Sequence, residues 1–147
     1  MPVKSVLITL ETNKMFLDIA EQLIKYSGLY GGMKLMLGTL EDHCDKFVSE
    51  YGYLDFVFLD HWKDMYMSDL KLLESKGLLK KGTCVVADNV LYPGVPECRK
   101  YVAFSPKYMT VEHGGEKGYT RPVVKDIVTE SVYQGEEGVD YCKFDSP

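Results

Sequence analysis

Two short apolar runs, each followed directly by polar side chains, constrain the fold of this chain more than any other feature. Residues 56–59 read FVFL and end at Asp60, and residues 85–87 read VVA and end at Asp88 and Asn89. An almost wholly apolar run of this length is typical of a strand buried on both faces, as in a parallel sheet. Because open α/β sheets bind ligands outside the carboxyl ends of their strands, we expect these three side chains at a ligand site.

Carboxylate and amide oxygens are ligands that suit Mg²⁺, which binds few protein groups and keeps substrate oxygens and waters in its shell. The alternative is that each polar residue only caps a helix or turns a loop. Three of them at two strand ends, with His61, Trp62 and Lys63 beside the first, favour a site.

The composition fits one domain and narrows the range of partners. The chain has 147 residues, of which 46% are hydrophobic and 27% charged, so it can bury a core. Its net charge of −5 argues against nucleic acid or an anionic membrane surface as the main partner. No apolar run is long enough to span a membrane, and the first residues lack a signal-peptide cleavage pattern. An intracellular location, cytoplasmic or organellar, is therefore expected.

The cysteines support the same location. Four are scattered through the sequence without a CxxC pair, namely Cys44, Cys84, Cys98 and Cys142. This spacing predicts reduced thiols, rather than a disulfide framework or a zinc site.

The remaining pattern predicts strands alternating with helices, followed by a hairpin. Strands are expected over residues 5–10, 33–37, 108–112 and 125–133 besides the two apolar runs, and helices over 13–26, 41–51, 68–75 and 96–101. The segment HGGEKGYTRP at 113–122 is too short for a helical crossover, so the last two strands should be antiparallel. The fold class is α/β, a mostly parallel sheet with a C-terminal antiparallel hairpin. Residues 1–135 form the expected domain, and an acidic tail, loose from Gln134 on, occupies 136–147.

With these segments in view, the chain resembles the catechol O-methyltransferase family over roughly residues 5–135. The resemblance rests on TLET at 9–12, LDFVFLDHWKD at 54–64, KKGTCVVADNVLYPGVP at 80–96 and VYQG at 132–135. It implies a Rossmann-like fold, the cofactor S-adenosylmethionine, Mg²⁺ and a catechol-type substrate.

The resemblance also implies a role for individual residues. The Mg²⁺ ligands would be Asp60, Asp88 and Asn89, and Lys63 would take the proton from a metal-bound catechol hydroxyl. For the cofactor and substrate, Glu11 would hold the ribose, His61 and Trp62 would line the adenine and methionine parts, and Pro93 would wall the catechol pocket. The chemistry agrees, since a divalent cation lowers the pKa of a coordinated hydroxyl and two adjacent hydroxyls can chelate it.

The sequence departs from the family pattern at its start and at three further positions. The helices, first strand and glycine-rich cofactor turn that open a family member are missing, which leaves a gap in the middle of the expected sheet. Either the two flanks pair directly, or another chain supplies a strand, or the chain is a fragment of a longer protein. Thr120 aligns with a glutamate that binds the second catechol hydroxyl, and Glu116 could substitute for it. Leu40 and Glu41 stand where a serine and a glutamine lie near the adenine.

Two functions follow as hypotheses. The first is a Mg²⁺- and S-adenosylmethionine-dependent catechol O-methyltransferase that needs a missing N-terminal part or a partner. The second is a catalytically inactive relative that serves as a structural or assembly subunit, with a neighbouring chain filling the gap in its sheet. A phosphotransfer domain is disfavoured because no glycine-rich phosphate loop follows a strand.

Overall fold

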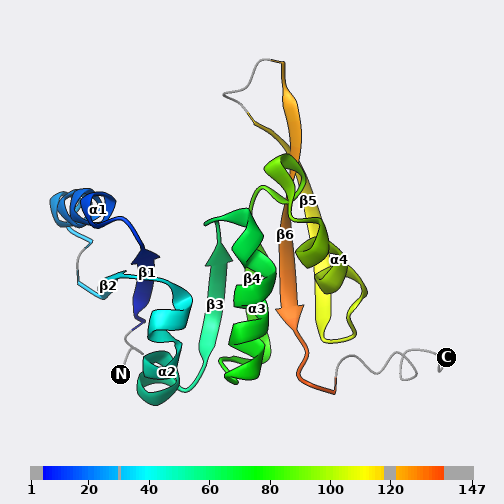
Figure 1. Ribbon diagram of the computed structural model, residues 1–147, viewed down its shortest axis with the longest axis horizontal. Coiled ribbons are helices and arrows are strands. Elements are labelled where there is room, and N and C mark those ends of the chain that lie inside the picture. Colours follow the sequence, from blue (N-terminus) through cyan, green and yellow to red (C-terminus); the bar gives the residue numbers. More distant parts are fainter. Residues whose placement is uncertain (1–4, 30, 118–121, 138–147) are drawn as a thin grey trace. The chain divides into compact units, whose positions relative to one another are not determined.

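The computed structural model describes residues 5–29, 31–117 and 122–137, and it contains strands and helices in the expected alternation (Figure 1). The strands are β1 (Leu7–Glu11), β2 (Met33–Leu37), β3 (Leu54–Leu59), β4 (Leu79–Ala87), β5 (Tyr108–Lys117) and β6 (Val124–Tyr133). The α-helices are α1 (Lys14–Tyr26), α2 (Leu40–Tyr51), α3 (Tyr66–Ser75) and α4 (Pro96–Phe104). Short turns η1 (Lys63–Met65) and η2 (Val90–Gly94) follow β3 and β4. The chain divides into two compact units, Met1–Lys46 and Phe47–Pro147.

The first unit contains a parallel pair of strands with a helix between them. Strand β1 pairs with β2, with Leu7 opposite Met33. The connecting helix α1 begins as predicted, since the side chain of Asn13 accepts a hydrogen bond from the backbone N–H of Met15 at 3.0 Å. Asparagine at this position satisfies an N–H group that has no partner within the helix.

The second unit contains a mixed four-stranded sheet in the order β3-β4-β6-β5. Strands β3 and β4 are parallel, whereas β6 runs antiparallel to both of its neighbours. The predicted antiparallel hairpin is therefore confirmed, but its strands are longer than expected. The first half of the segment assigned to a loop belongs to β5, where Gly114 and Gly115 pair with Ile127 and Asp126. The two glycines misled the prediction because an edge strand tolerates them in its ladder.

One face of this sheet is packed and the other is open. Figure 1 shows α3 and α4 in front of the sheet, and Leu70 and Leu73 of α3 are buried there. On the opposite face the side chains of Phe56 and Phe58 are 56% and 55% exposed. Apolar strand residues that remain this exposed are typical of a surface made to be covered by another polypeptide segment.

The described strands form two separate sheets, so β3 lies at an edge of the larger one. Among the described residues of the second unit, 47–117 and 122–137, no strand pairs with the outer side of β3. An unpaired edge of this kind presents backbone N–H and C=O groups that can pair with another chain.

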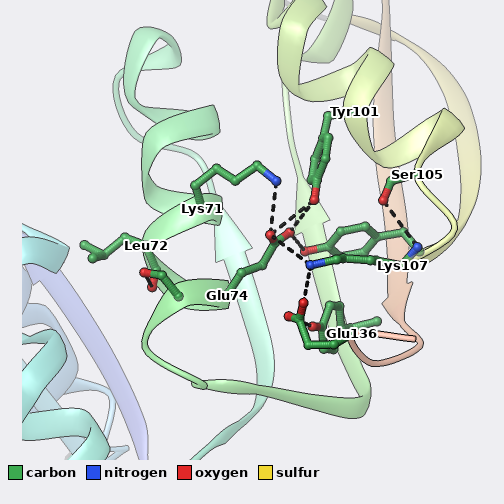
Figure 2. A network of polar contacts seen from close by, with 10 residues as sticks. Lys71, Leu72, Glu74, Tyr101, Ser105, Lys107 and Glu136 are labelled. Atoms are coloured by element: carbon green, nitrogen blue, oxygen red, sulfur yellow. Dashed lines mark hydrogen bonds and ion pairs between the residues drawn. The ribbon is translucent and has the colours of Figure 1, made fainter. Parts of the chain in front are cut away.

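A polar network fixes the amino-terminal end of the larger sheet (Figure 2). The side chain of Glu74 is 6% exposed, accepts hydrogen bonds from Tyr101 and Tyr108 and pairs with Lys71. Lys107 lies 4.0 Å from the same carboxylate and also pairs with Glu136. Because each charge has an opposite charge beside it, the network can remain ionised in a partly buried place.

The sequence predicted a loose tail from Gln134 on, but the first residues beyond β6 are attached to the sheet. The backbone N–H of Gln134 donates to the carbonyl of Lys107 at 2.7 Å, and Glu136 binds the amine of the same lysine. The remainder of the predicted tail, residues 138–147 with Cys142, lies outside the described residues. Cys44, Cys84 and Cys98 are free thiols. None of the helices described is long and apolar enough to cross a membrane.

Candidate functional site

The carboxyl ends of β3 and β4 meet, as the sequence predicted. The backbone N–H of Asp88, directly after β4, donates to the carbonyl of Leu59 at the end of β3 at 3.0 Å. Asp60 and Asp88 therefore follow two adjacent strand ends. This proximity arises because parallel neighbours in a sheet end on the same side.

Lys63 joins the two strand ends through its amine. The short turn η1 folds the chain back after β3, which brings Nζ to 3.1 Å from Oδ1 of Asp60 and to 3.5 Å from the backbone carbonyl of Asp88. Only 16% of the Lys63 side chain is exposed, against 47% for Asp60. The amine is thus held beside both acidic positions, with its aliphatic part shielded from water.

Tyr66 supports this lysine, and sequence reasoning missed it. Lys63 Nζ donates to the Tyr66 hydroxyl oxygen at 2.6 Å, and that hydroxyl donates to the carbonyl of Leu59 at 2.7 Å. Burial, and then the charges of Asp60 and Asp88, raise the pKa of the Tyr66 hydroxyl, so it stays protonated and keeps donating. The available signal was its position three residues after Lys63, at the start of α3.

Asn89 has an unusual backbone conformation. Its φ of 58° and ψ of 41° lie in the left-handed region, and it is the one non-glycine residue with positive φ in the described chain. Asparagine tolerates this region better than most residues. Its own N–H donates to Oδ1 of Asp88 at 2.7 Å, which fixes that carboxylate beside it.

Asp126 on β6 is the second residue that sequence reasoning missed. Its Oδ2 accepts a hydrogen bond from Nδ2 of Asn89 at 3.1 Å, and its Oδ1 accepts from the backbone N–H groups of Leu91, Tyr92 and Ile127. Burial opposes the charged form, but these hydrogen bonds outweigh it and lower the pKa of Asp126 to about 2. No local pattern could reveal this contact, because the two side chains are 37 residues apart in the sequence.

The other predicted residues are distributed as follows. His61 stacks on the ring of Tyr66, and its Nε2 lies 3.0 Å from Oδ2 of Asp69. Trp62 is 78% exposed. Glu11 ends β1 in the first unit, where its Oε1 accepts the backbone N–H of Asn13 at 2.8 Å. These positions leave His61 and Trp62 next to the acidic strand end, with Trp62 open to a ligand.

A cavity of about 400 Å³ lies beside this site and provides space for a small molecule. It is lined by Leu91, Gly114, Gly115, Glu116, Lys125, Asp126 and Ile127. Glu116, the possible substitute for the family's glutamate, is therefore a wall of the cavity. Pro93 is exposed and is not one of the lining residues, and Thr120 lies outside the described residues.

A larger cavity of about 900 Å³ lies at the opposite end of the sheet, around Lys71, Glu74 and Lys107. Four of its charged groups, those of Lys71, Glu74, Lys107 and Glu136, pair with one another (Figure 2) and are therefore less available to a ligand. Size alone would favour the larger cavity as a substrate site. The smaller cavity is the better candidate because it lies beside the polar residues at the strand ends.

The donor set at the strand ends fits a hard cation with a partly open shell. No cluster of three or more His, Cys, Asp or Glu side chains suited to a metal is found in the described part of the chain. Two carboxylates, from Asp60 and Asp88, and the amide oxygen of Asn89 are instead available. Mg²⁺ is commonly bound by one or two carboxylates, with waters and substrate oxygens completing the octahedron.

Comparison with known proteins identifies relatives of one kind. Residues 1–111 match the model of a family described as O-methyltransferase. Catechol O-methyltransferase B of Danio rerio is 42% identical over 131 residues, which cover 88% of this chain and 49% of the relative. Catechol O-methyltransferase of Sus scrofa is 36% identical over 131 residues, covering 88% of this chain and 69% of the relative. The chain spans about half the length of the Danio rerio and Mus musculus relatives.

Solved structures agree on the fold. The O-methyltransferase from Bacillus cereus in complex with SAH matches with a TM-score of 0.75 and 19% identity, over 88% of this chain and 63% of that chain. The O-methyltransferase TomG from Streptomyces achromogenes in complex with SAM matches with a TM-score of 0.72 and 19% identity, over 92% and 65%. The α/β fold with a mixed sheet is thus the fold of S-adenosylmethionine-dependent methyltransferases, as predicted.

Proposed function

Because the chain belongs to the O-methyltransferase family, we propose that it supports Mg²⁺-dependent transfer of a methyl group from S-adenosylmethionine to a catechol hydroxyl, together with a further polypeptide segment. The observation that carries this proposal is the position of Lys63 between the two acidic strand ends. Asp60, Asp88 and Asn89 would hold the cation. Bound there, Mg²⁺ would lower the pKa of a catechol hydroxyl.

The residues of the chain would bind the substrate and move its proton. Lys63 Nζ, in its uncharged form, would accept the proton of the hydroxyl that receives the methyl group, and S-adenosylmethionine would supply that group. Tyr66 supports the role of Lys63, since its hydroxyl fixes the amine at 2.6 Å. Glu116 and Leu91, which line the smaller cavity, would contact the ring and its second hydroxyl. Trp62, His61 and Glu11 would contact the cofactor.

The additional segment is proposed to pair with β3. Within the described residues of the second unit the outer side of β3 is unpaired, and Phe56 and Phe58 are more than half exposed. A strand from another chain or from a further part of the same protein would satisfy the free backbone groups. This segment is also proposed to supply the cofactor-binding turn.

The same open edge favours a second candidate, a catalytically inactive assembly subunit. Titration calorimetry with S-adenosylmethionine, with and without Mg²⁺, separates the two candidates. Micromolar binding, followed by methylation of a catechol that Lys63→Ala abolishes, supports the enzyme. A folded chain that binds no cofactor, even in its native assembly, supports the subunit instead.

The partner is tested by measuring the mass of the protein isolated from its native source under non-denaturing conditions. We expect a mass above the 16.7 kDa of the chain. Where the segment belongs to a separate chain, Phe58→Lys should lose the additional mass, whereas a segment of the same polypeptide would be retained. Phe104→Lys is the matched control, because Phe104 is 81% exposed at the end of α4, away from β3. A native mass of one chain alone would contradict the partner.

A further inference from the structure

We propose that Asp126 is a positioning residue that determines which end of the Asn89 side-chain amide faces the cation site. This inference rests on the proposed function, since it concerns the same metal site. It adds a residue from β6, a strand outside the segments that carry the predicted ligands.

The geometry lets Asp126 set the orientation of one proposed metal ligand, Asn89. Its residue surface is 8% exposed, and Oδ2 lies 3.1 Å from Nδ2 of Asn89. An ionised carboxylate can only accept hydrogen bonds, so it must attract the NH₂ end of the amide rather than the oxygen. The Oδ1 atom of Asn89 is then directed away from Asp126 and is free to bind a cation.

The second oxygen of Asp126 fixes the backbone on which Asn89 is carried. Oδ1 lies 3.0 Å from the N–H of Leu91, 3.2 Å from that of Tyr92 and 2.8 Å from that of Ile127. The turn after β4 therefore cannot shift without breaking hydrogen bonds to a charged group, which are stronger than neutral ones. Both the position and the rotation of the Asn89 amide are fixed by one carboxylate.

This arrangement explains why position 89 is an asparagine. At position 89 the backbone is left-handed, which asparagine and aspartate tolerate. Of these two, only asparagine can both donate to the carboxylate of Asp126 and present an oxygen to a cation. Residues that orient metal ligands in this way typically affect metal affinity by about 10- to 100-fold when they are replaced.

The test exchanges the two functional groups. Asp126→Asn keeps the shape but places an NH₂ group against Nδ2 of Asn89, which should turn the Asn89 amide and direct its NH₂ group toward the cation. We expect about 10- to 100-fold weaker binding of Mn²⁺, measured by electron paramagnetic resonance of the free ion. The double variant Asp126→Asn with Asn89→Asp restores a donor and acceptor pair, and it should recover the affinity.

Glu130→Gln is the matched control, because it removes one negative charge from the same strand at a side chain that is 47% exposed. It should bind Mn²⁺ as the unmodified chain does. Equal affinity in Asp126→Asn overturns the positioning role and leaves the proposed function standing. No Mn²⁺ binding by the unmodified chain overturns both.

A second measurement does not depend on the metal or on the stability of a variant. The chain has two asparagines, Asn13 and Asn89, so their side-chain amides can be distinguished by nuclear magnetic resonance after selective ¹⁵N labelling. We expect at least about tenfold slower solvent exchange of the Asn89 amide protons than of those of Asn13, whose side chain accepts rather than donates. Equal exchange would overturn the contact with Asp126.

Discussion

The amine of Lys63 lies 2.6 Å from the hydroxyl oxygen of Tyr66, and this hydroxyl lies 2.7 Å from the carbonyl of Leu59 at the end of β3. A backbone group at the strand end, a buried hydroxyl and a candidate catalytic amine thus form one chain of hydrogen bonds. The tyrosine acts as a support for the lysine, since its raised pKa keeps the hydroxyl protonated.

Replacing Tyr66 by phenylalanine should destabilise the fold and release the lysine. The change removes one of the two donors to the carbonyl of Leu59, the other being the backbone N–H of Asp88, and it also removes the oxygen that accepts from Lys63. The loss of these two hydrogen bonds should cost about 1–3 kcal/mol of unfolding free energy. Urea unfolding followed by circular dichroism measures this loss. Tyr26→Phe is the control, because Tyr26 is 94% exposed and should change stability little. Equal unfolding free energies of the two variants would mean that the hydroxyl of Tyr66 does not stabilise the fold.

The buried carboxylate of Glu74 should matter more than an exposed one in a well-formed ion pair. Glu74→Gln weakens the contacts to Lys71 and two tyrosines, and we expect it to cost about 1–3 kcal/mol. Glu112→Gln removes an exposed pair with Arg99 and should cost less than about 1 kcal/mol. Urea unfolding of the two variants gives the comparison, and a larger effect for Glu112 would contradict the importance of the network in Figure 2.

Stability should decrease at alkaline pH. Burial raises the pKa of the Cys98 thiol from 9.0 to about 11, and burial followed by the hydrogen bond to Glu74 raises the pKa of the Tyr108 hydroxyl. The unfolded chain therefore releases protons that the folded chain keeps. The stabilisation from Cys98 is complete below pH 9 and is lost as the pH rises towards 11, by about 1 kcal/mol per pH unit.

Unfolding with urea at pH values between 8 and 10 measures this slope. Cys98→Ala should reduce the slope most between pH 8.5 and 9.5, where most tyrosines of the unfolded chain are still protonated because their pKa is about 10. An unchanged slope in this variant would assign the alkaline loss to other groups.

Trp62 should report cofactor binding directly. It is the one tryptophan in the sequence, and its 78% exposure predicts emission typical of an indole in water. A cofactor that covers the ring should shift the emission to shorter wavelength, because the indole leaves water. A shift in emission that saturates as S-adenosylmethionine is added would support the predicted contact between Trp62 and the cofactor. Binding seen by calorimetry without any change in emission would place the cofactor elsewhere.

The sequence by itself determined the local elements and the polar residues that end them. Apolar runs predicted β3 and β4, and Asp60, Asp88 and Asn89 follow these strands because a parallel pair must end at one edge. The hairpin followed from a connection too short for a crossover. Its length was underestimated, since Gly114 and Gly115 belong to β5. Each of these features depends on residues that are close together in the sequence, so it can be predicted from the local pattern of apolar and polar residues.

The tertiary structure alone decided which side chains support the site. Tyr66 has no signal in the sequence beyond its spacing from Lys63, and its importance comes from complete burial beneath two strand ends. Asp126 reaches Asn89 across 37 residues because β6 pairs with β4. The strand order of the larger sheet, β3-β4-β6-β5, was likewise decided by pairing between distant strands. Contacts between strands that are distant in the sequence form only when the chain folds, so they cannot be predicted from composition or periodicity.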